Sequence, residues 1–309
     1  MAFMRRKLVQ HGGSTLVVSI PSKWAKKHEL EKGQEINIEE KEDYLLVSTA
    51  GEKGGKKKKE LSIENYTYYS LRSIISGLYR TGYDEIKIQF NEKIPISIIH
   101  KIMDLLPGFE ANFVGEKTCV INSIIKSSED MVSNMINKLF LNLKMMFDMA
   151  LKSGKKITLD DAFSIKNNCL RLRDYCHRMI RNLNYGNENS YDYYTIVFSL
   201  EKISGLVLHS LLTYLINNKV QLTKKDLDLI KKNKEMLDTL HKLYLNKKWN
   251  DAEKFYNKLR NHLLSVRKKG LLMDNGDKTI YMHMESNFHY LFALSSRVLN
   301  IAVSVDSED

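Results

Sequence analysis

Six basic side chains near the N-terminus are the residues whose type and spacing most clearly suggest a binding chemistry. They are Arg5, Arg6, Lys7, Lys23, Lys26 and Lys27. The first thirty residues contain one acid, Glu29, so six positive charges minus one negative charge leave +5. The rest of the first fifty residues is acidic, and this segregation predicts positive potential on one face. A two-fold dimer would double that face at a spacing that could match two half-sites on DNA, whereas a solvated surface is the alternative.

Four arginines on one predicted helix form a second basic group. They are Arg171, Arg173, Arg178 and Arg181. Guanidinium groups suit phosphate, but ion pairs on a helix surface explain such a group equally well. Residues 224–269 are also basic, with 14 Lys or Arg against 6 Asp or Glu, and here we favour the polar outer face of two amphipathic helices.

Catalytic and metal-binding motifs are missing from the sequence. It contains no G-x-S-x-G, Walker loop, H-E-x-x-H or paired C-x-x-C, so we expect a protein that is not an enzyme. Cys169 and Cys176 lie seven positions apart, about 10 Å along a helix, which is too far for one disulfide. We expect both to be reduced core residues. His177, His283 and His289 lack ligand spacing, and no chemistry is expected of them.

Length and composition limit the class of protein. The 309 residues predict two or three domains, and the net charge of +11 predicts an anionic partner. Three cysteines are an odd and sparse set, which is typical of the reducing cytoplasm. No apolar region follows the basic start, and residues 205–216 are interrupted by His209, Ser210 and Thr213, so we expect neither a signal peptide nor membrane insertion.

The patterning predicts a multidomain α+β protein. Residues 1–50 are expected to form short strands at 16–20, 36–38 and 44–48, with a brief helix over 22–28. Such a small strand-rich domain buries too little apolar surface to be stable alone, so we expect it to dimerise. Residues 51–60 are rich in glycine and lysine and are expected to be a linker.

The remaining chain is expected to form two further regions. Residues 61–124 predict a small α+β module with a helix, a strand, a helix and two strands, at 68–80, 85–90, 95–106, 111–115 and 118–122. Residues 125–309 predict an all-α region with helices near 127–153, 159–183, 190–218, 223–246, 249–269 and 277–304. Thr158 and Thr223 begin capping-box-like sequences.

The N-terminal segment resembles the AbrB/SpoVT swapped-hairpin family of DNA-binding domains, including its antitoxin branch. The resemblance covers residues 4–48 and rests on the order of strand, Ile20-Pro21, short helix, Leu30-Glu31-Lys32-Gly33 and strand. It implies two interdigitated hairpins in an obligate homodimer, with basic residues near the first strand and the short helix contacting DNA. Because the charge segregation agrees with this motif, we favour DNA contact by the six basic residues.

The helical region resembles the PhoU family of phosphate-uptake regulators, through residues 127–305 and the phrase Leu200-Glu201-Lys202-Ile203-Ser204. That family is recognised by repeated E-x-x-x-D motifs, whose carboxylates bind one metal jointly. The resemblance implies a six-helix bundle and a divalent or iron ion, with Glu201 as a remnant ligand. Gly205 replaces the aspartate, however, and an ion-paired or surface glutamate is the alternative.

Together the two resemblances predict a cytoplasmic transcriptional regulator of phosphate uptake, of the kind found in archaea. DNA and a second copy of the chain are the expected partners. The alternative is an adaptor that does not bind DNA and modulates a phosphate transporter ATPase or a signalling protein. A third possibility is an antitoxin-like role, with a toxin bound to the helical part.

Overall fold

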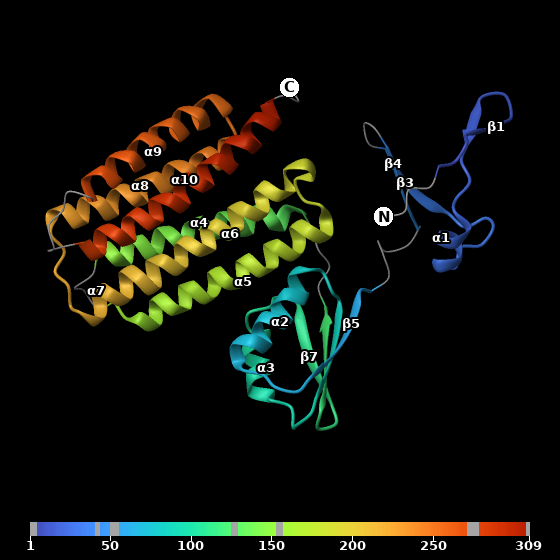
Figure 1. Cartoon of the computed structure of the whole chain (residues 1–309), viewed down its shortest axis with the longest axis horizontal. Helices are drawn as coiled ribbons and strands as arrows, with labels where there is room; N and C mark the ends of the chain where they lie inside the picture. Colours follow the sequence, from blue (N-terminus) through green and yellow to red (C-terminus); the bar gives the residue numbers. More distant parts are fainter. Residues whose placement is uncertain are drawn as a thin grey trace. The chain divides into compact units, whose positions relative to one another are not determined.

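The computed structural model describes residues 5–40, 44–49, 56–124, 129–152, 157–270 and 278–306. The chain divides into two compact units, Met1–Lys57 and Lys58–Asp309, of which the second contains both the α+β module and the helices (Figure 1).

The first unit consists of two hairpins and one short helix. Its elements are β1 (Val9–His11), β2 (Thr15–Val17), α1 (Ser22–Lys27), β3 (Ile36–Glu40) and β4 (Leu45–Thr49). β1 pairs antiparallel with β2, and β3 pairs antiparallel with β4, which makes two separate sheets. The strand predicted over 16–20 ends at Val17 in the structure. Val17 pairs with Val9, the first residue of β1, and no strand of the described chain lies opposite residues 18–20.

The described residues of this unit form no hydrophobic core of their own. None of the side chains that the structure describes between residues 5 and 49 is buried. Large apolar side chains are instead open to water, including Leu16 at 63% exposure and Ile38 at 59%. Apolar residues that alternate along strands normally pack against a second layer, so this unit exposes a surface that is typical of a contact face.

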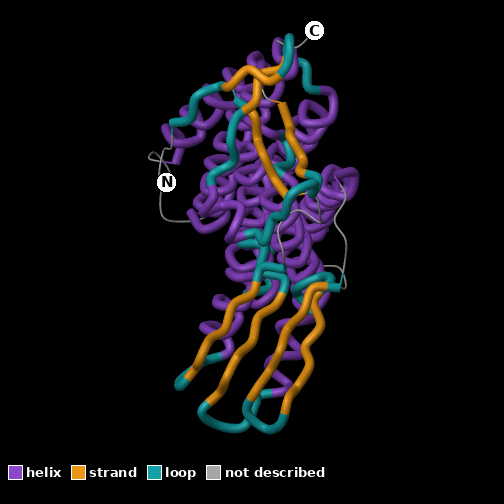
Figure 2. The backbone as a smooth tube through the Cα atoms, turned by 90° about the vertical axis from the view of Figure 1, so that its right-hand side faces the viewer, coloured by secondary structure: helices purple, strands orange, loops and turns teal. Residues whose placement is uncertain are grey.

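The α+β module begins the second unit. Its elements are β5 (Lys58–Ile63), α2 (Tyr68–Arg80), β6 (Glu85–Phe90), α3 (Ile96–Met103), β7 (Phe109–Val114) and β8 (Thr118–Ser123). The sheet order is β5-β6-β8-β7, with β5 and β6 parallel and the other pairs antiparallel. Ile86, Ile88 and Phe90 alternate with exposed residues and pack beneath α2 and α3, which cover one face of the sheet (Figures 1 and 2).

The first strand of this sheet is absent from the sequence prediction. Lys58, Lys59 and Glu60 were expected in the linker over 51–60, of which residues 51–55 lie outside the described chain, but they form the start of β5. The three side chains are exposed on an edge strand, where charged residues are common because they oppose pairing with other chains. This strand therefore shows little of the hydrophobic alternation that reveals a strand in a sequence.

The helical region agrees closely with its prediction. It contains α4 (Glu129–Leu151), α5 (Leu159–Leu183), the 3₁₀ turn η1 (Asn187–Asn189), α6 (Ser190–Leu206), the π-helical η2 (Val207–Leu212), α7 (Thr213–Asn217), α8 (Lys224–Asn246), α9 (Trp249–Gly270) and α10 (Lys278–Asp306). The predicted starts at 127 and 277 and the predicted end at 153 lie outside the described residues. The capping boxes at Thr158 and Thr223 are confirmed, since each hydroxyl accepts from the backbone N–H three residues later.

Two stretches of this region are long and apolar enough to cross a membrane by length and composition, residues 187–217 and 278–305. Both contribute to the one core of the bundle, for example through Leu200 and Leu211 of the first and Phe288 and Leu294 of the second. The apolar window of the first stretch is 61% buried and that of the second 39%, so burial explains the apolar character of the first better than that of the second. The two stretches are weak evidence for a membrane span.

A buried arginine joins the module to the helical region. Arg178 of α5 is 3% exposed, and its guanidinium donates to the carbonyls of Tyr79 and Tyr83 at 3.0 and 2.7 Å. It also pairs with the Asp84 carboxylate at 2.7 Å. Of the four arginines on this helix, Arg178 is thus an ion-paired residue at an interface.

We expect Arg178→Met to lower the free energy of unfolding by about 3–5 kcal/mol, because it removes the buried guanidinium that donates to two carbonyls and pairs with the Asp84 carboxylate. The exposed Arg181 of the same helix supplies the control, since Arg181→Met should change stability by about 0.5 kcal/mol or less. Urea unfolding of the full-length variants measures both effects. Equal midpoints for the two variants would show that the buried contacts do not hold the junction.

Candidate functional site

The six basic residues near the N-terminus fall on two elements of the first unit. Arg5, Arg6 and Lys7 directly precede β1, and the three lysines belong to α1 (Figure 1). Because Lys23, Lys26 and Lys27 are spaced i, i+3 and i+4, they share one face of the helix. All six side chains are exposed, and none forms an ion pair with another described residue. Their charges are therefore available to a polyanion such as DNA.

Glu201 lies in a buried ion-pair network, the alternative that the sequence left open. Its carboxylate is 4% exposed on α6, and one oxygen contacts the Lys166 ammonium from α5. The other oxygen lies 3.1 Å from Arg173 Nη1. Burial by itself raises the pKa of Glu201, but Lys166 and Arg173 outweigh it and hold this pKa below its usual range.

These residues do not fit a metal ion at Glu201. An ammonium and a guanidinium already face its two oxygens, and a third oxygen ligand is missing because residue 205 is a glycine. A Cβ at Gly205 would lie 3.5 Å from Lys166 Nζ, so the lysine head occupies the space beside that position. The described part of the chain holds no group of three or more His, Cys, Asp or Glu side chains that could bind a metal.

The same network continues to a pocket between α2, α5 and α6. Arg173 also pairs with Asp174, through Nε at 2.9 Å and Nη2 at 2.8 Å. Asp174 is 1% exposed and accepts in addition from Arg80 Nη1 of α2 at 2.8 Å. One buried carboxylate therefore orients two guanidinium groups that line the pocket.

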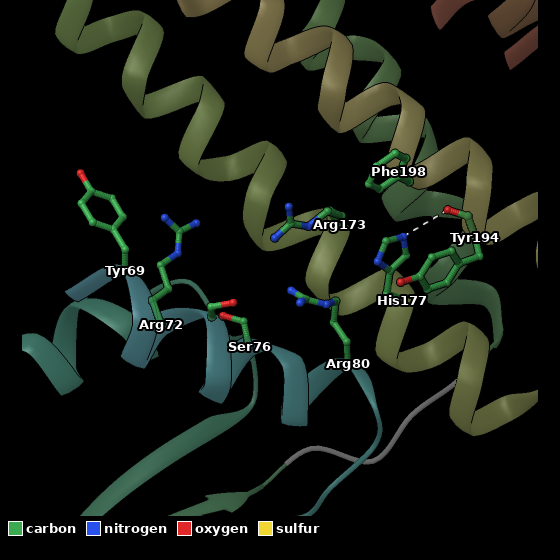
Figure 3. A pocket seen from close by; sticks show the side chains of 9 residues that line it. Tyr69, Arg72, Ser76, Arg80, Arg173, His177, Tyr194 and Phe198 are labelled. Atoms are coloured by element: carbon green, nitrogen blue, oxygen red, sulfur yellow. Dashed lines mark hydrogen bonds between the residues drawn. The ribbon is translucent and has the colours of Figure 1, made fainter. Parts of the chain in front are cut away.

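The pocket has a volume of about 350 Å³ and a basic and aromatic lining. Its guanidinium groups come from Arg72 and Arg80 of α2 and from Arg173 of α5, and Figure 3 shows all three facing one space. Arg72 forms no ion pair with any residue that the structure describes. Tyr194 and Phe198 of α6 supply aromatic rings.

His177 contributes an uncharged imidazole to this pocket. Its ring is 2% exposed and stacks on Tyr194, with centroids 3.6 Å apart. Nε2 lies 3.1 Å from the Tyr194 carbonyl, which can only accept, so Nε2 carries the proton and Nδ1 is an acceptor (Figure 3). Burial, together with the charges of Arg173 and Arg80, lowers the pKa of His177 to about 3.

The sequence did not reveal this pocket. His177 was expected to have no chemistry, and of the four arginines on α5 only Arg173 lines it. The lining residues occur in pairs four apart on each helix, such as Ser76 and Arg80, or Arg173 and His177. That spacing shows that two residues share a helix face, but it does not show which faces meet.

The expectation for the cysteines is confirmed, since Cys169 and Cys176 are free and buried in the core of the bundle. Burial raises the pKa of the Cys169 thiol to about 11 and also raises that of Cys176, so both thiols are protonated. Burial and a raised pKa are typical of structural cysteines.

Comparison with known proteins gives a match for the N-terminal segment alone. The family model for antidote-toxin recognition MazE, bacterial antitoxin, matches residues 9–53. No curated protein matches the chain, and no solved structure does. The match supports an AbrB-like swapped-hairpin domain at the N-terminus, a type of domain that binds DNA or serves as an antitoxin. It ends at residue 53, so the resemblance of the helical region to PhoU proteins stays a prediction.

His177 should make the protein sensitive to acid. Its pKa is lower in the folded chain than in the unfolded chain, so only the unfolded chain gains this proton between about pH 6.5 and about pH 3. Stability due to His177 is complete above that window and falls as the pH drops through it. We expect His177→Gln to weaken the loss of urea resistance between about pH 7.5 and about pH 5.

The exposed His209 provides the matched control for this experiment. His209→Gln makes the same substitution at an exposed position, and we expect His177→Gln to change the pH dependence more than His209→Gln does. A His177→Gln protein with the wild-type pH dependence would show that the pKa of His177 is the same in the folded and the unfolded chain.

Proposed function

We propose that this protein is a cytoplasmic DNA-binding transcriptional regulator of phosphate uptake, with a dimeric N-terminal domain that binds DNA. The observation that carries the proposal is the set of six exposed basic residues, which form no ion pairs with described residues. Lys23, Lys26 and Lys27 lie within residues 9–53, which match the MazE model, and the other three lie just before that segment. Phosphate contacts from lysine and arginine supply the affinity of such domains and fix their register on the duplex.

Dimerisation is supported by the surface of the first unit. Leu16, Val18 and Ile38 are exposed, and residues 18–20 have no strand opposite them in the described chain. A second copy would supply both a hairpin to lie opposite these residues and a layer to cover the apolar side chains. It would also place two copies of each basic group on one surface, as two DNA half-sites require.

The link to phosphate homeostasis rests on the resemblance of the helical region to PhoU proteins. In this proposal the region senses phosphate status through a ligand or a protein partner. A ligand that binds one arrangement of the helical regions better than another would change the spacing of the two DNA-binding faces and hence the affinity for the operator.

Two other functions remain as alternatives. An adaptor would use the N-terminal domain only to dimerise, and its helical region would contact a phosphate transporter ATPase or a signalling protein. The MazE match favours a second candidate, an antitoxin whose C-terminal part binds a toxin. The adaptor predicts no binding to DNA, and the antitoxin predicts a stable complex with a toxin.

DNA binding tests the main proposal. We expect the full-length protein to bind DNA from upstream of its own gene and of phosphate-transport genes more tightly than random DNA, with a steep dependence on salt. Replacing Arg6 and Lys26 with alanine should weaken binding and reduce the slope of log K against log salt by about 2.

The exposed pair Lys231 and Lys232 of α8 gives the control, because their double alanine variant makes the same change in charge outside the first unit. It should bind like the wild type. Absence of binding at low salt would refute the regulator and favour the adaptor, and an equal loss in both double variants would show that the charge acts without a defined interface.

The oligomeric state tests the proposed dimer. We expect sedimentation equilibrium to give twice the chain mass of 35.9 kDa, and Val18→Glu to shift the protein toward the monomer because it places a charge in the apolar contact. Val114→Glu, at an exposed valine of β7, should remain dimeric. A wild-type monomer, or a Val18→Glu variant that dimerises normally, would contradict this interface.

A further inference from the structure

We propose that the pocket between α2, α5 and α6 binds a small phosphate ester, with its phosphate group held by the guanidinium groups of Arg72, Arg80 and Arg173. The three groups come from two helices and face one space (Figure 3). Guanidinium forks match the oxygens of phosphate and remain charged at every physiological pH.

The charges around the pocket leave room for an anion. Five cationic side chains, Lys166, Arg173, Arg80, Arg72 and Lys202, lie in or next to it, and two carboxylates, Asp174 and Glu201, pair with all of them but Arg72. Three positive charges are thus in excess. A phosphate monoester carries about −1.5 to −2 charge at neutral pH, which matches this excess better than a single carboxylate does.

Two buried polar groups point to a ligand independently of the charges. Ser76 Oγ and His177 Nδ1 line the pocket at 3% and 2% residue exposure, and neither has a hydrogen-bond partner among the described residues. Buried polar groups in native proteins are almost always paired, because an unpaired one is costly. The hydroxyl can donate to a phosphate oxygen, and the imidazole Nδ1 can accept from a hydroxyl of the ligand.

The size and lining of the pocket indicate an ester and not the free ion. Its volume of about 350 Å³ lies within the range of roughly 300–1,000 Å³ that is typical of small-molecule sites, and inorganic phosphate would fill only a small part of it. Tyr194 and Phe198 offer apolar surface to an organic group beside the arginines. A hydroxylated organic part would also provide the donor that His177 Nδ1 lacks.

This inference names the ligand class for the sensing region, and only its role as a signal rests on the proposed function. Binding of the ester requires neither DNA nor a dimer. It is therefore measured without DNA, so that a failure of the pocket and a failure of the DNA-binding proposal give different results.

Isothermal titration calorimetry of the full-length protein tests the pocket, with AMP and glucose 6-phosphate as esters. Inorganic phosphate and adenosine are the comparison ligands. We expect at least one ester to bind, inorganic phosphate to bind more weakly than that ester, and adenosine not to bind. No binding of either ester at millimolar concentration would overturn the proposal. Adenosine binding as tightly as AMP, or inorganic phosphate as tightly as the better ester, would overturn it too.

Substitutions locate the ligand within the pocket. Arg72→Gln should weaken binding of the ester by about tenfold or more, because it removes a charged donor that has no described ion-pair partner in the protein. Arg171→Gln, at an exposed arginine of α5 that does not line this pocket, should bind normally.

Ser76→Ala separates a binding role from a structural one. The Ser76 hydroxyl makes no hydrogen bond within the described chain, so its loss should leave stability unchanged or higher while it weakens ester binding. If Arg72→Gln and Ser76→Ala both bind the ester like the wild type, the ligand occupies another site and the proposal fails.

Discussion

Buried charge at the contact between α2 and α5 is the constraint on which the second unit depends. The Arg178 guanidinium is charged and buried, so the end of α2 and the turn after it must present carbonyls and a carboxylate to it. That requirement fixes how the α+β module sits on the bundle. The rings of Tyr79 and Phe109 lie against the same guanidinium, with centroids 5.2 and 5.0 Å from its central carbon, and help to exclude solvent from it.

The same helix contact creates the pocket. Asp174 is buried between Arg173 and Arg80, and its position orients both guanidinium groups toward one space. The ion pairs that join α2 to α5 and the cations that line the pocket therefore share residues. Arg72 also lines the pocket, but it forms no ion pair with a described residue. The Asp174 carboxylate lowers the excess positive charge of the network. It also holds Arg173 and Arg80 in place, so a ligand bound in the pocket would meet donors whose positions are already set.

The first unit differs from the second, because its described residues bury no side chain that could stabilise it. Alternating apolar side chains and two separate hairpins leave no buried residue among those described. Association with a second copy explains both features, and it agrees with the type of domain that the family model describes. The six basic side chains of this unit are exposed as well, so in the proposed dimer they would stay available to DNA.

Sequence reasoning succeeded where local physics decides the outcome. The period of 3.6 and the capping threonines placed the long helices within a few residues, and alternation found β6 and β8. β5 escaped because its lysines are exposed at a sheet edge, and the π-helical η2 escaped because its residues read as an ordinary helix. The sequence by itself determined the elements, the basic N-terminus and the resemblance to swapped hairpins. Only the tertiary structure decided that Arg178 is a buried link, that Glu201 faces Lys166 instead of a metal, and that His177 opens into a pocket, because the faces that meet come from segments distant in the chain.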